Sequence, residues 1–150
     1  PDPTQDYIKR VIGLPGDRIQ MIGGILNING QPVQREFVRD VQSECSGRVG
    51  TFKEYMETLP NGVRHVIYEN SDQDTYDNTK VYTVPPDNYF MMGDNRDCSL
   101  DSRASVGYVP VENFVGRAEV RWFSLEDASF WQVWKWPFAL RYDRLFTGIE

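Results

Sequence analysis

Short segments of this chain alternate apolar with polar residues, and Gly, Pro, Asn and Asp separate these segments. Such alternation is typical of β-strands with one buried face, and the four separating residue types favour turns. Almost no segment repeats its apolar residues with the 3.6-residue period of an α-helix. The pattern predicts a mainly β fold, with strands over residues 7–12, 18–22, 25–28, 63–69, 80–84, 88–94 and 114–124.

Residues 34–80 differ from the sequence on either side because they are polar and contain no long apolar run. They include a turn signal at Asn61 and Gly62 and an acidic stretch at 71–77. We interpret them as an inserted β-rich lobe. Residues 1–33 and 81–150 would then be the two parts of the main domain.

The chain has 150 residues, of which 40% are hydrophobic and 25% charged, so it can bury the core of one globular domain with an insertion. Its net charge of −6 comes from scattered acidic residues, and the absence of a basic stripe argues against a nucleic-acid partner. No apolar run approaches the roughly 20 residues that span a bilayer. We expect the chain as given to be soluble and, because it does not begin with Met, to be a piece of a longer protein.

The cysteines and the histidine do not match the pattern of a metal site or of a histidine-based catalytic site. Cys45 and Cys98 form no Cys-x-x-Cys pair and His65 is the only histidine, so neither a zinc site nor a histidine-based catalytic triad is expected. A disulfide between Cys45 and Cys98 is one alternative, but the sequence alone favours two unpaired thiols.

The first predicted strand carries two adjacent cations, Lys9 and Arg10, which would point to opposite faces. One interpretation is an edge strand, in which a lysine discourages pairing with other chains. A second interpretation is that Lys9 is the base for a serine nucleophile, because lysine can take this role when burial lowers its pKa. Lys9 has Tyr7 and Val11 on its face of the strand, so it suits this role better than Lys53, Lys80 and Lys135.

The nucleophile would come from the loop GDNRDCSLDSR at 93–103, in which Ser99 and Ser102 are both candidates. The competing interpretation is a charged turn whose Asp and Arg side chains satisfy one another and the backbone. A calcium loop that starts at Asp94 is excluded, because Arg96 and Cys98 occupy positions that need oxygen ligands.

DYIKRVIGLPGD at 6–17, YFMMGDNRDCSLDSR at 89–103 and a following GRA together resemble the catalytic segments of bacterial type I signal peptidases. The resemblance implies a signal-peptidase-like β-barrel or sandwich, with 34–80 as a variable second β-lobe. It implies a membrane-associated serine endopeptidase with a Ser/Lys dyad that removes signal peptides from exported preproteins and needs no cofactor or metal. The catalytic domain would lie on the periplasmic face of the bacterial inner membrane.

The resemblance also assigns roles to individual residues. Lys9 corresponds to the general base, and Ser99 to a serine that orients this lysine and is not itself the nucleophile. The residues that would support the site are Arg10, which pairs with Asp94, together with Asp101 and Arg103. The residues that would pair with the extended substrate are Asp6, Tyr7 and Ile8.

One part of the family pattern is missing from these 150 residues. The family's nucleophile belongs to a Ser-Met-x-Pro motif upstream of the Lys-Arg strand, and the chain contains no such motif. We therefore expect this chain by itself to have no peptidase activity, although the full-length protein should have it. The alternative is a non-catalytic accessory or binding subunit of the same fold.

The aromatic segment FWQVWKWPF at 130–138 has a composition that suits the interface of a lipid bilayer. The alternative is that its rings cap the β-core. The resemblance favours membrane contact, because the family has a Trp-rich surface near its active site. The residues expected at the lipid surface are Trp122, Trp131, Trp134 and Trp136.

Overall fold

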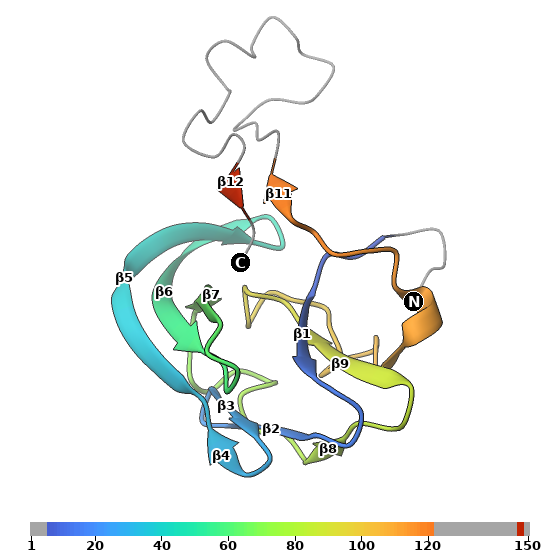
Figure 1. The fold of residues 1–150 in the computed structure, drawn as a ribbon. Coiled ribbons are helices and arrows are strands. Elements are labelled where there is room, and N and C mark those ends of the chain that lie inside the picture. The colour runs from blue at the N-terminus through green and yellow to red at the C-terminus, as the bar shows by residue number, and fades with distance from the viewer. Residues whose placement is uncertain (1–5, 122–146, 149–150) are drawn as a thin grey trace, which may run out of the picture. The chain divides into compact units, whose positions relative to one another are not determined.

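The computed structural model describes residues 6–121 and 147–148. These residues belong to two compact units that divide between residues 114 and 115. The first unit contains three antiparallel sheets (Figure 1). In the second unit, β11 (Val120–Arg121) pairs with β12 (Thr147–Gly148). The mainly β prediction is confirmed, and none of the sheets closes into a barrel within the described ranges.

Two small sheets of the first unit enclose its core. One sheet has the order β1–β9–β10 and the other the order β4–β3–β2–β8. The strands of the first are β1 (Arg10–Gly13), β9 (Asn88–Met92) and β10 (Val109–Pro110), which a 3-10 turn at Val111–Asn113 follows. Those of the second are β2 (Arg18–Ile22), β3 (Ile25–Ile28), β4 (Gln31–Pro32) and β8 (Tyr82–Thr83).

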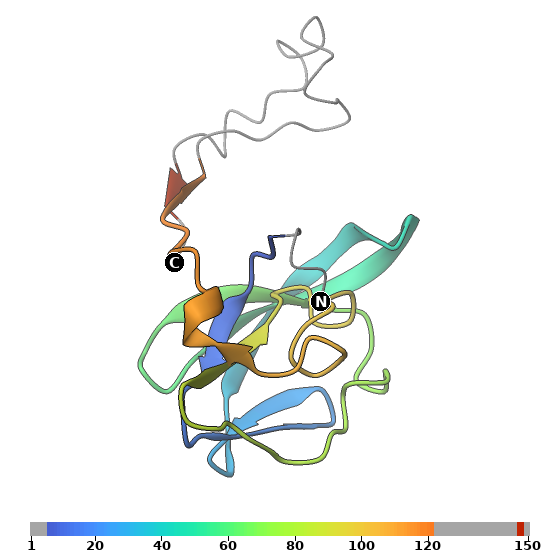
Figure 2. The same cartoon turned by 90° about the vertical axis from the view of Figure 1, so that its right-hand side faces the viewer.

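The core consists of the inward-facing members of these strands and their neighbouring turns. Burying an aliphatic or aromatic side chain of this size contributes about 1.5 to 3 kcal/mol before the entropy cost of folding. The buried cluster comprises Ile12, Ile19, Met21, Leu26, Ile28, Val33, Leu59, Val84, Phe90 and Met92. It holds β1 and β9 in place, and these two strands lie side by side in both views (Figure 1, Figure 2).

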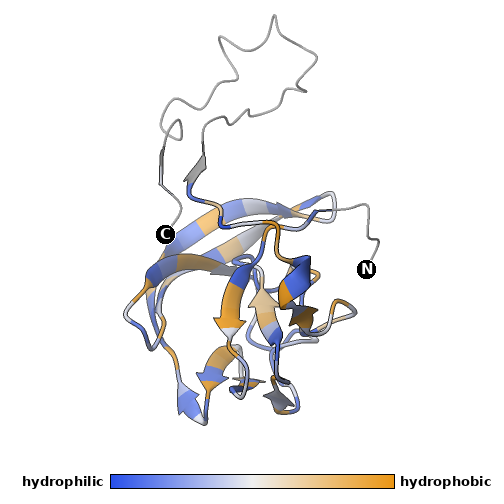
Figure 3. Cartoon of the chain, turned by 45° about the vertical axis from the view of Figure 1, so that its right-hand side comes forward, coloured by the Kyte–Doolittle hydropathy of each residue, from blue (hydrophilic) through white to orange (hydrophobic). Residues whose placement is uncertain are grey.

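The third sheet has the order β5–β6–β7 and contains the two longest strands of the described chain, β5 (Gln34–Cys45) and β6 (Arg48–Thr58), followed by β7 (Arg64–Glu69). Most of β5 is exposed on both faces, so its sequence lacks a hydrophobic period. Figure 3 shows mixed hydrophilic and hydrophobic colours along this hairpin. The three strands lie within the predicted insertion at 34–80, and the division into domains stays a prediction.

Several predicted strands are shorter than expected. The first begins at Arg10 and not near residue 7, because its ladder with β9 joins only Arg10–Gly13 to Phe90–Met92. The predicted strand over 114–124 forms β11 over Val120–Arg121 only, and residues 122–124 lie outside the described ranges.

The two cysteines form a disulfide, so the expectation of unpaired thiols was wrong. The Cα atoms of Cys45 and Cys98 lie 5.6 Å apart, although 53 residues separate them in sequence. Cys45 ends β5 at the tip of the long hairpin, and this hairpin carries it to the loop that contains Cys98. Sequence spacing cannot reveal such a pair, because the contact depends on the length and curvature of two strands.

Among the residues that the structure describes, no helix is long and apolar enough to cross a membrane.

Candidate functional site

Lys9 and Ser99 meet in the structure. Lys9 directly precedes β1, and the loop after β9 that we call the Ser99 loop (residues 93–103) carries Ser99. Antiparallel pairing of Arg10 with Met92 places the start of β1 beside the end of β9. The Lys9 ammonium nitrogen Nζ donates a hydrogen bond of 2.7 Å to Ser99 Oγ. The pairing of β1 with β9 therefore creates a contact between residues 90 positions apart.

The surroundings of Lys9 favour its neutral form. Partial burial lowers the lysine pKa from its ordinary value, and the positive charge of Arg103 lowers it further. The carboxylates of Asp101 and Asp94 act in the opposite direction, but they do not cancel the effect of burial. A lysine with a lowered pKa is available as a base nearer to neutral pH than an exposed lysine.

Gly93 makes the close approach of Lys9 and Ser99 sterically feasible. A Cβ atom on residue 93 would overlap Oγ and Cβ of Ser99 and would lie 3.5 Å from Lys9 Nζ. Any other residue would therefore displace Ser99 from the lysine. Sequence analysis did not single out Gly93, although a glycine after the apolar run of β9 was an available signal for close packing.

Asp101 and Arg103 organise the end of the Ser99 loop. The Asp101 carboxylate is fully buried and accepts hydrogen bonds from the Gly93 amide at 3.0 Å and from the Arg103 amide at 3.1 Å. The Arg103 guanidinium donates two more, at 3.0 and 2.9 Å. Burial alone would raise the pKa of Asp101, but these hydrogen bonds and the Arg103 charge hold it below its ordinary value. Asp101 thus stays ionised and ties both ends of the loop together.

Arg10 and Asp94 join the first strand to the start of the Ser99 loop. The Arg10 guanidinium donates to both carboxylate oxygens of Asp94, at 2.9 and 3.0 Å. Such a bidentate contact fixes orientation as well as distance. Lys9 and Arg10 therefore have different partners, and both partners belong to the same loop.

Ser102, the other serine considered from sequence, faces the backbone of β9. Its Oγ accepts a 2.8 Å hydrogen bond from the Met91 amide, and its own amide donates to the Met91 carbonyl at 3.0 Å. The side chain is buried and continues the hydrogen bonding of the sheet. The hydrogen-bond partner of Lys9 is Ser99.

The residues predicted to contact substrate lie at an accessible edge. Asp6, Tyr7 and Ile8 are exposed, with Ile8 at 83% of its full accessible area. They lead into β1, which is the edge strand of its sheet within the described chain. The four tryptophans expected at a membrane surface lie outside the described residues.

A buried charge cluster that sequence analysis did not predict lies behind the Ser99 loop. The Arg96 guanidinium pairs with both carboxylate oxygens of Glu57 on β6, and each of the two residues is only 1% exposed. His65 on β7 lies with Nε2 3.1 Å from Glu57 and Nδ1 3.6 Å from Asp94. Only the fold brings these charges together, and no spacing in the sequence indicates it.

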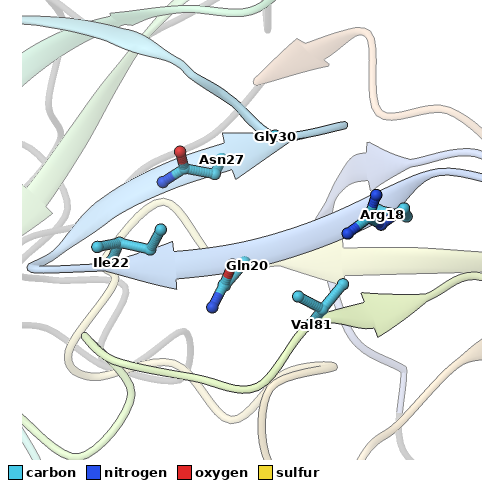
Figure 4. Close-up of a pocket in the computed structure, with 6 residues that line it drawn as sticks. All are labelled: Arg18, Gln20, Ile22, Asn27, Gly30 and Val81. Atoms are coloured by element: carbon cyan, nitrogen blue, oxygen red, sulfur yellow. The ribbon is translucent and has the colours of Figure 1, made fainter.

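The described part of the chain also has a hollow of about 210 Å³ beside β2 and β3 (Figure 4). Its walls are formed by Arg18, Gln20, Ile22, Asn27, Gly30 and Val81. No residue of the predicted site contributes to it, so this hollow is not the candidate site.

Comparison with known proteins gives one consistent result. The family described as "Signal peptidase, peptidase S26" matches residues 1–123. Signal peptidase I of Rickettsia canadensis is 38% identical over an alignment 165 residues long, which covers 99% of this chain and 61% of the relative. Signal peptidase I of Rickettsia prowazekii is 37% identical with the same coverage, and that of Rickettsia bellii is 36% identical over 95% of this chain and 54% of the relative. The chain thus spans between 54% and 61% of the length of these three relatives.

Proposed function

Since the chain belongs to the peptidase S26 family of signal peptidases, we propose that the full-length protein is a serine endopeptidase that cleaves signal peptides from exported preproteins. The observation that carries the proposal is the 2.7 Å contact between Lys9 Nζ and Ser99 Oγ at a partly buried lysine. A neutral amine held in a defined direction is what a serine nucleophile needs as its base.

In the proposed mechanism the neutral Lys9 amine removes the proton from a serine hydroxyl as the serine oxygen attacks the scissile carbonyl carbon. The ammonium then returns this proton to the leaving amine, the C–N bond breaks, and an acyl-enzyme forms that water hydrolyses. Ser99 keeps the lysine amine in the required direction, and Asp101 and Arg103 keep Ser99 in place. No cofactor or metal takes part in these steps.

Substrate would bind along the exposed edge that leads into β1. An extended peptide can add a strand there through backbone hydrogen bonds, and neighbouring side chains then select its residues. Asp6, Tyr7 and Ile8 are the residues assigned to this contact. Their exposure supports the assignment, because a peptide must reach them from solvent.

The proposed location is the bacterial inner membrane, with the catalytic domain on its periplasmic face and the four tryptophans in contact with lipid. The Cys45–Cys98 disulfide supports an extracytoplasmic location, because disulfides persist in oxidising compartments such as the periplasm. The expected partners are the signal peptides of preproteins and the bilayer surface, and nucleic acid is not among them.

The nucleophile is proposed to be a serine of a Ser-Met-x-Pro motif, which does not occur in the 150 residues. We accordingly expect the 150-residue chain by itself to leave a signal-peptide substrate uncleaved. The test of the function therefore uses the full-length protein.

The experiment compares cleavage of a preprotein by the full-length protein and by its Lys9→Ala and Lys53→Ala variants. Loss of a general base lowers the rate by about 10²- to 10⁴-fold, so Lys9→Ala should lose at least that much of kcat/KM. Lys53 is exposed on β6, and its replacement should leave kcat/KM unchanged. Because the pKa of Lys9 is lowered, the wild-type rate should reach half of its maximum below pH 10.5, the ordinary pKa of lysine.

Two results would contradict the proposal. If the Lys9→Ala protein retained wild-type turnover, Lys9 could not be the base. If the wild-type protein bound the signal peptide without cleaving it, the accessory-subunit interpretation would replace the peptidase.

A further inference from the structure

The β5–β6–β7 sheet contacts the Ser99 loop along its backbone. The Tyr68 amide on β7 donates to the Asp94 carbonyl at 2.9 Å, and the Arg96 amide donates to the Tyr68 carbonyl at 2.8 Å. Beyond β7, the Asp97 carboxylate accepts from the amides of Asn70 at 2.7 Å and Ser71 at 3.0 Å. The first half of the loop is therefore attached to β7 and to the residues that follow it.

A buried ion pair adds a side-chain connection between the same two parts. The Arg96 side chain of the Ser99 loop binds Glu57, the penultimate residue of β6, and both side chains are almost fully buried. Desolvating two charges is costly, and removing one partner leaves the other uncompensated. His65 extends the cluster to Asp94, which itself binds Arg10 next to Lys9. Polar and charged side chains thus link the sheet to the Ser99 loop and to the Arg10–Asp94 pair beside Lys9.

The Cys45–Cys98 disulfide provides a covalent connection directly beside the site. Cys98 precedes Ser99, so the tip of the long hairpin is bonded to the neighbour of the serine that contacts Lys9. The connections to the sheet described above all lie on the N-terminal side of Ser99. The bonds between Asp101 and Gly93 and between Asp101 and Arg103 hold the C-terminal side. Ser99 is consequently fixed from both directions.

We propose that the β5–β6–β7 sheet is an intramolecular brace for the catalytic base, in which Glu57 and the Cys45–Cys98 disulfide act as positioning residues that hold Ser99 against Lys9. The importance of this brace for catalysis rests on the proposed function, whereas its effect on Lys9 does not. A brace is needed because Ser99 Oγ must stay within hydrogen-bond distance of Lys9 Nζ, although the two residues belong to different segments of the fold.

The brace predicts that loosening the sheet changes the titration of Lys9. The charged groups that face Lys9 are Asp101, Arg103 and Asp94, all of which belong to the Ser99 loop. When this loop moves away, water reaches the amine and the burial that lowers its pKa is lost. A sheet that merely stabilised the fold would leave the titration of Lys9 unchanged in any variant that still folds.

The test measures the pH dependence of Lys9 acetylation in the full-length protein, by mass spectrometry of the peptide that contains it. The variants are Glu57→Gln and the double replacement Cys45→Ser with Cys98→Ser. The matched control is Glu54→Gln, because Glu54 also lies buried on β6 but forms its ion pair with Arg39 on β5 and not with an arginine of the Ser99 loop.

We expect the apparent pKa of Lys9 to rise by about one unit in Glu57→Gln and in the Cys45→Ser, Cys98→Ser double variant. In Glu54→Gln the apparent pKa of Lys9 should stay unchanged. One unit corresponds to a roughly tenfold loss of kcat near neutral pH, with KM nearly constant. Circular dichroism checks folding. Should Glu57→Gln not fold, the serine double variant decides, because it leaves no buried charge unpaired. An unchanged Lys9 pKa in that folded variant would overturn the brace.

Acetylation requires no substrate, so the two proposals can fail separately. A protein that cleaves no preprotein, but whose Lys9 titration responds to the variants, would overturn the proposed function and keep the brace. If the protein cleaves preprotein but the titration of Lys9 is the same in both variants as in the wild type, the brace is overturned and the proposed function stands.

Discussion

At the scale of single residues, the site depends on the absence of a side chain at Gly93. Lys9 and Ser99 provide the chemistry, but Gly93 provides the space, since any Cβ at residue 93 would occupy the position of the Ser99 side chain. The same glycine donates its amide to Asp101, so one residue both admits Ser99 and anchors the loop that carries it.

Gly93→Ala should therefore be much more damaging than an ordinary glycine replacement in a loop. The added methyl group displaces Ser99, and we expect kcat to fall at least tenfold, together with a loss of about 1 to 3 kcal/mol in the free energy of unfolding from overpacking. Steady-state kinetics of the full-length protein and urea unfolding measure both effects. Gly30→Ala is the control for a glycine that has free space around it, although its positive φ adds some backbone strain of its own.

Retention of full activity by Gly93→Ala would show that Ser99 can move without consequence. Such a result would remove the basis for assigning Ser99 an orienting role.

At the scale of elements, strands with a buried face could be predicted from the sequence, and strands exposed on both faces could not. β2 and β3 have the predicted bounds because their side chains alternate between the core and the surface or pack fully into the core. β5 and β6 are the longest strands, but no hydrophobic period marks them, since both faces of β5 are largely exposed. Their pairing relies on backbone hydrogen bonds and cross-strand contacts such as the Arg39–Glu54 ion pair, which a single strand's sequence does not display.

The junction between the end of β7 and the Ser99 loop offers a test at this scale. Asp97→Ala removes the acceptor of the Asn70 and Ser71 amides, and each lost hydrogen bond should cost about 0.5 to 1.5 kcal/mol. Amide hydrogen exchange should become faster at these two residues, while the core strand β9 stays protected.

Asp40→Ala is the matched control, because Asp40 is an exposed carboxylate on β5. Equal exchange rates at Asn70 and Ser71 in the wild-type and Asp97→Ala proteins would mean that Asp97 does not hold this junction.

At the scale of the whole molecule, buried charges make stability depend on pH. Burial raises the pKa of Glu57, but His65 and Arg96 lower it more strongly, to about 2 in the folded protein. Its ordinary value of 4.5 applies to the unfolded chain. The folded state therefore binds fewer protons, and the contribution of Glu57 to stability is complete above about pH 4.5 and lost as the pH falls toward 2.

We expect this group to contribute on the order of 3 kcal/mol to the difference in unfolding free energy between pH 7 and pH 2. Urea unfolding at both pH values should show a smaller fall for Glu57→Gln than for the wild-type protein, even though the variant starts less stable. Identical falls for wild type and Glu57→Gln would exclude Glu57 as the source.

The β class, the bounds of β2 and β3 and the candidates Lys9 and Ser99 could be predicted from the sequence alone, because local alternation and the two long motifs occupy consecutive residues. The folded chain was needed to show that Cys45 and Cys98 are bonded, that Glu57 and Arg96 form a buried pair, and that Gly93 makes room for Ser99. The disulfide and the ion pair join segments far apart in the chain, which become neighbours only when the long hairpin and the sheet containing β1 and β9 have formed. The approach of Ser99 to Gly93 depends instead on how the loop folds back, with the Gly93 amide bonded to Asp101.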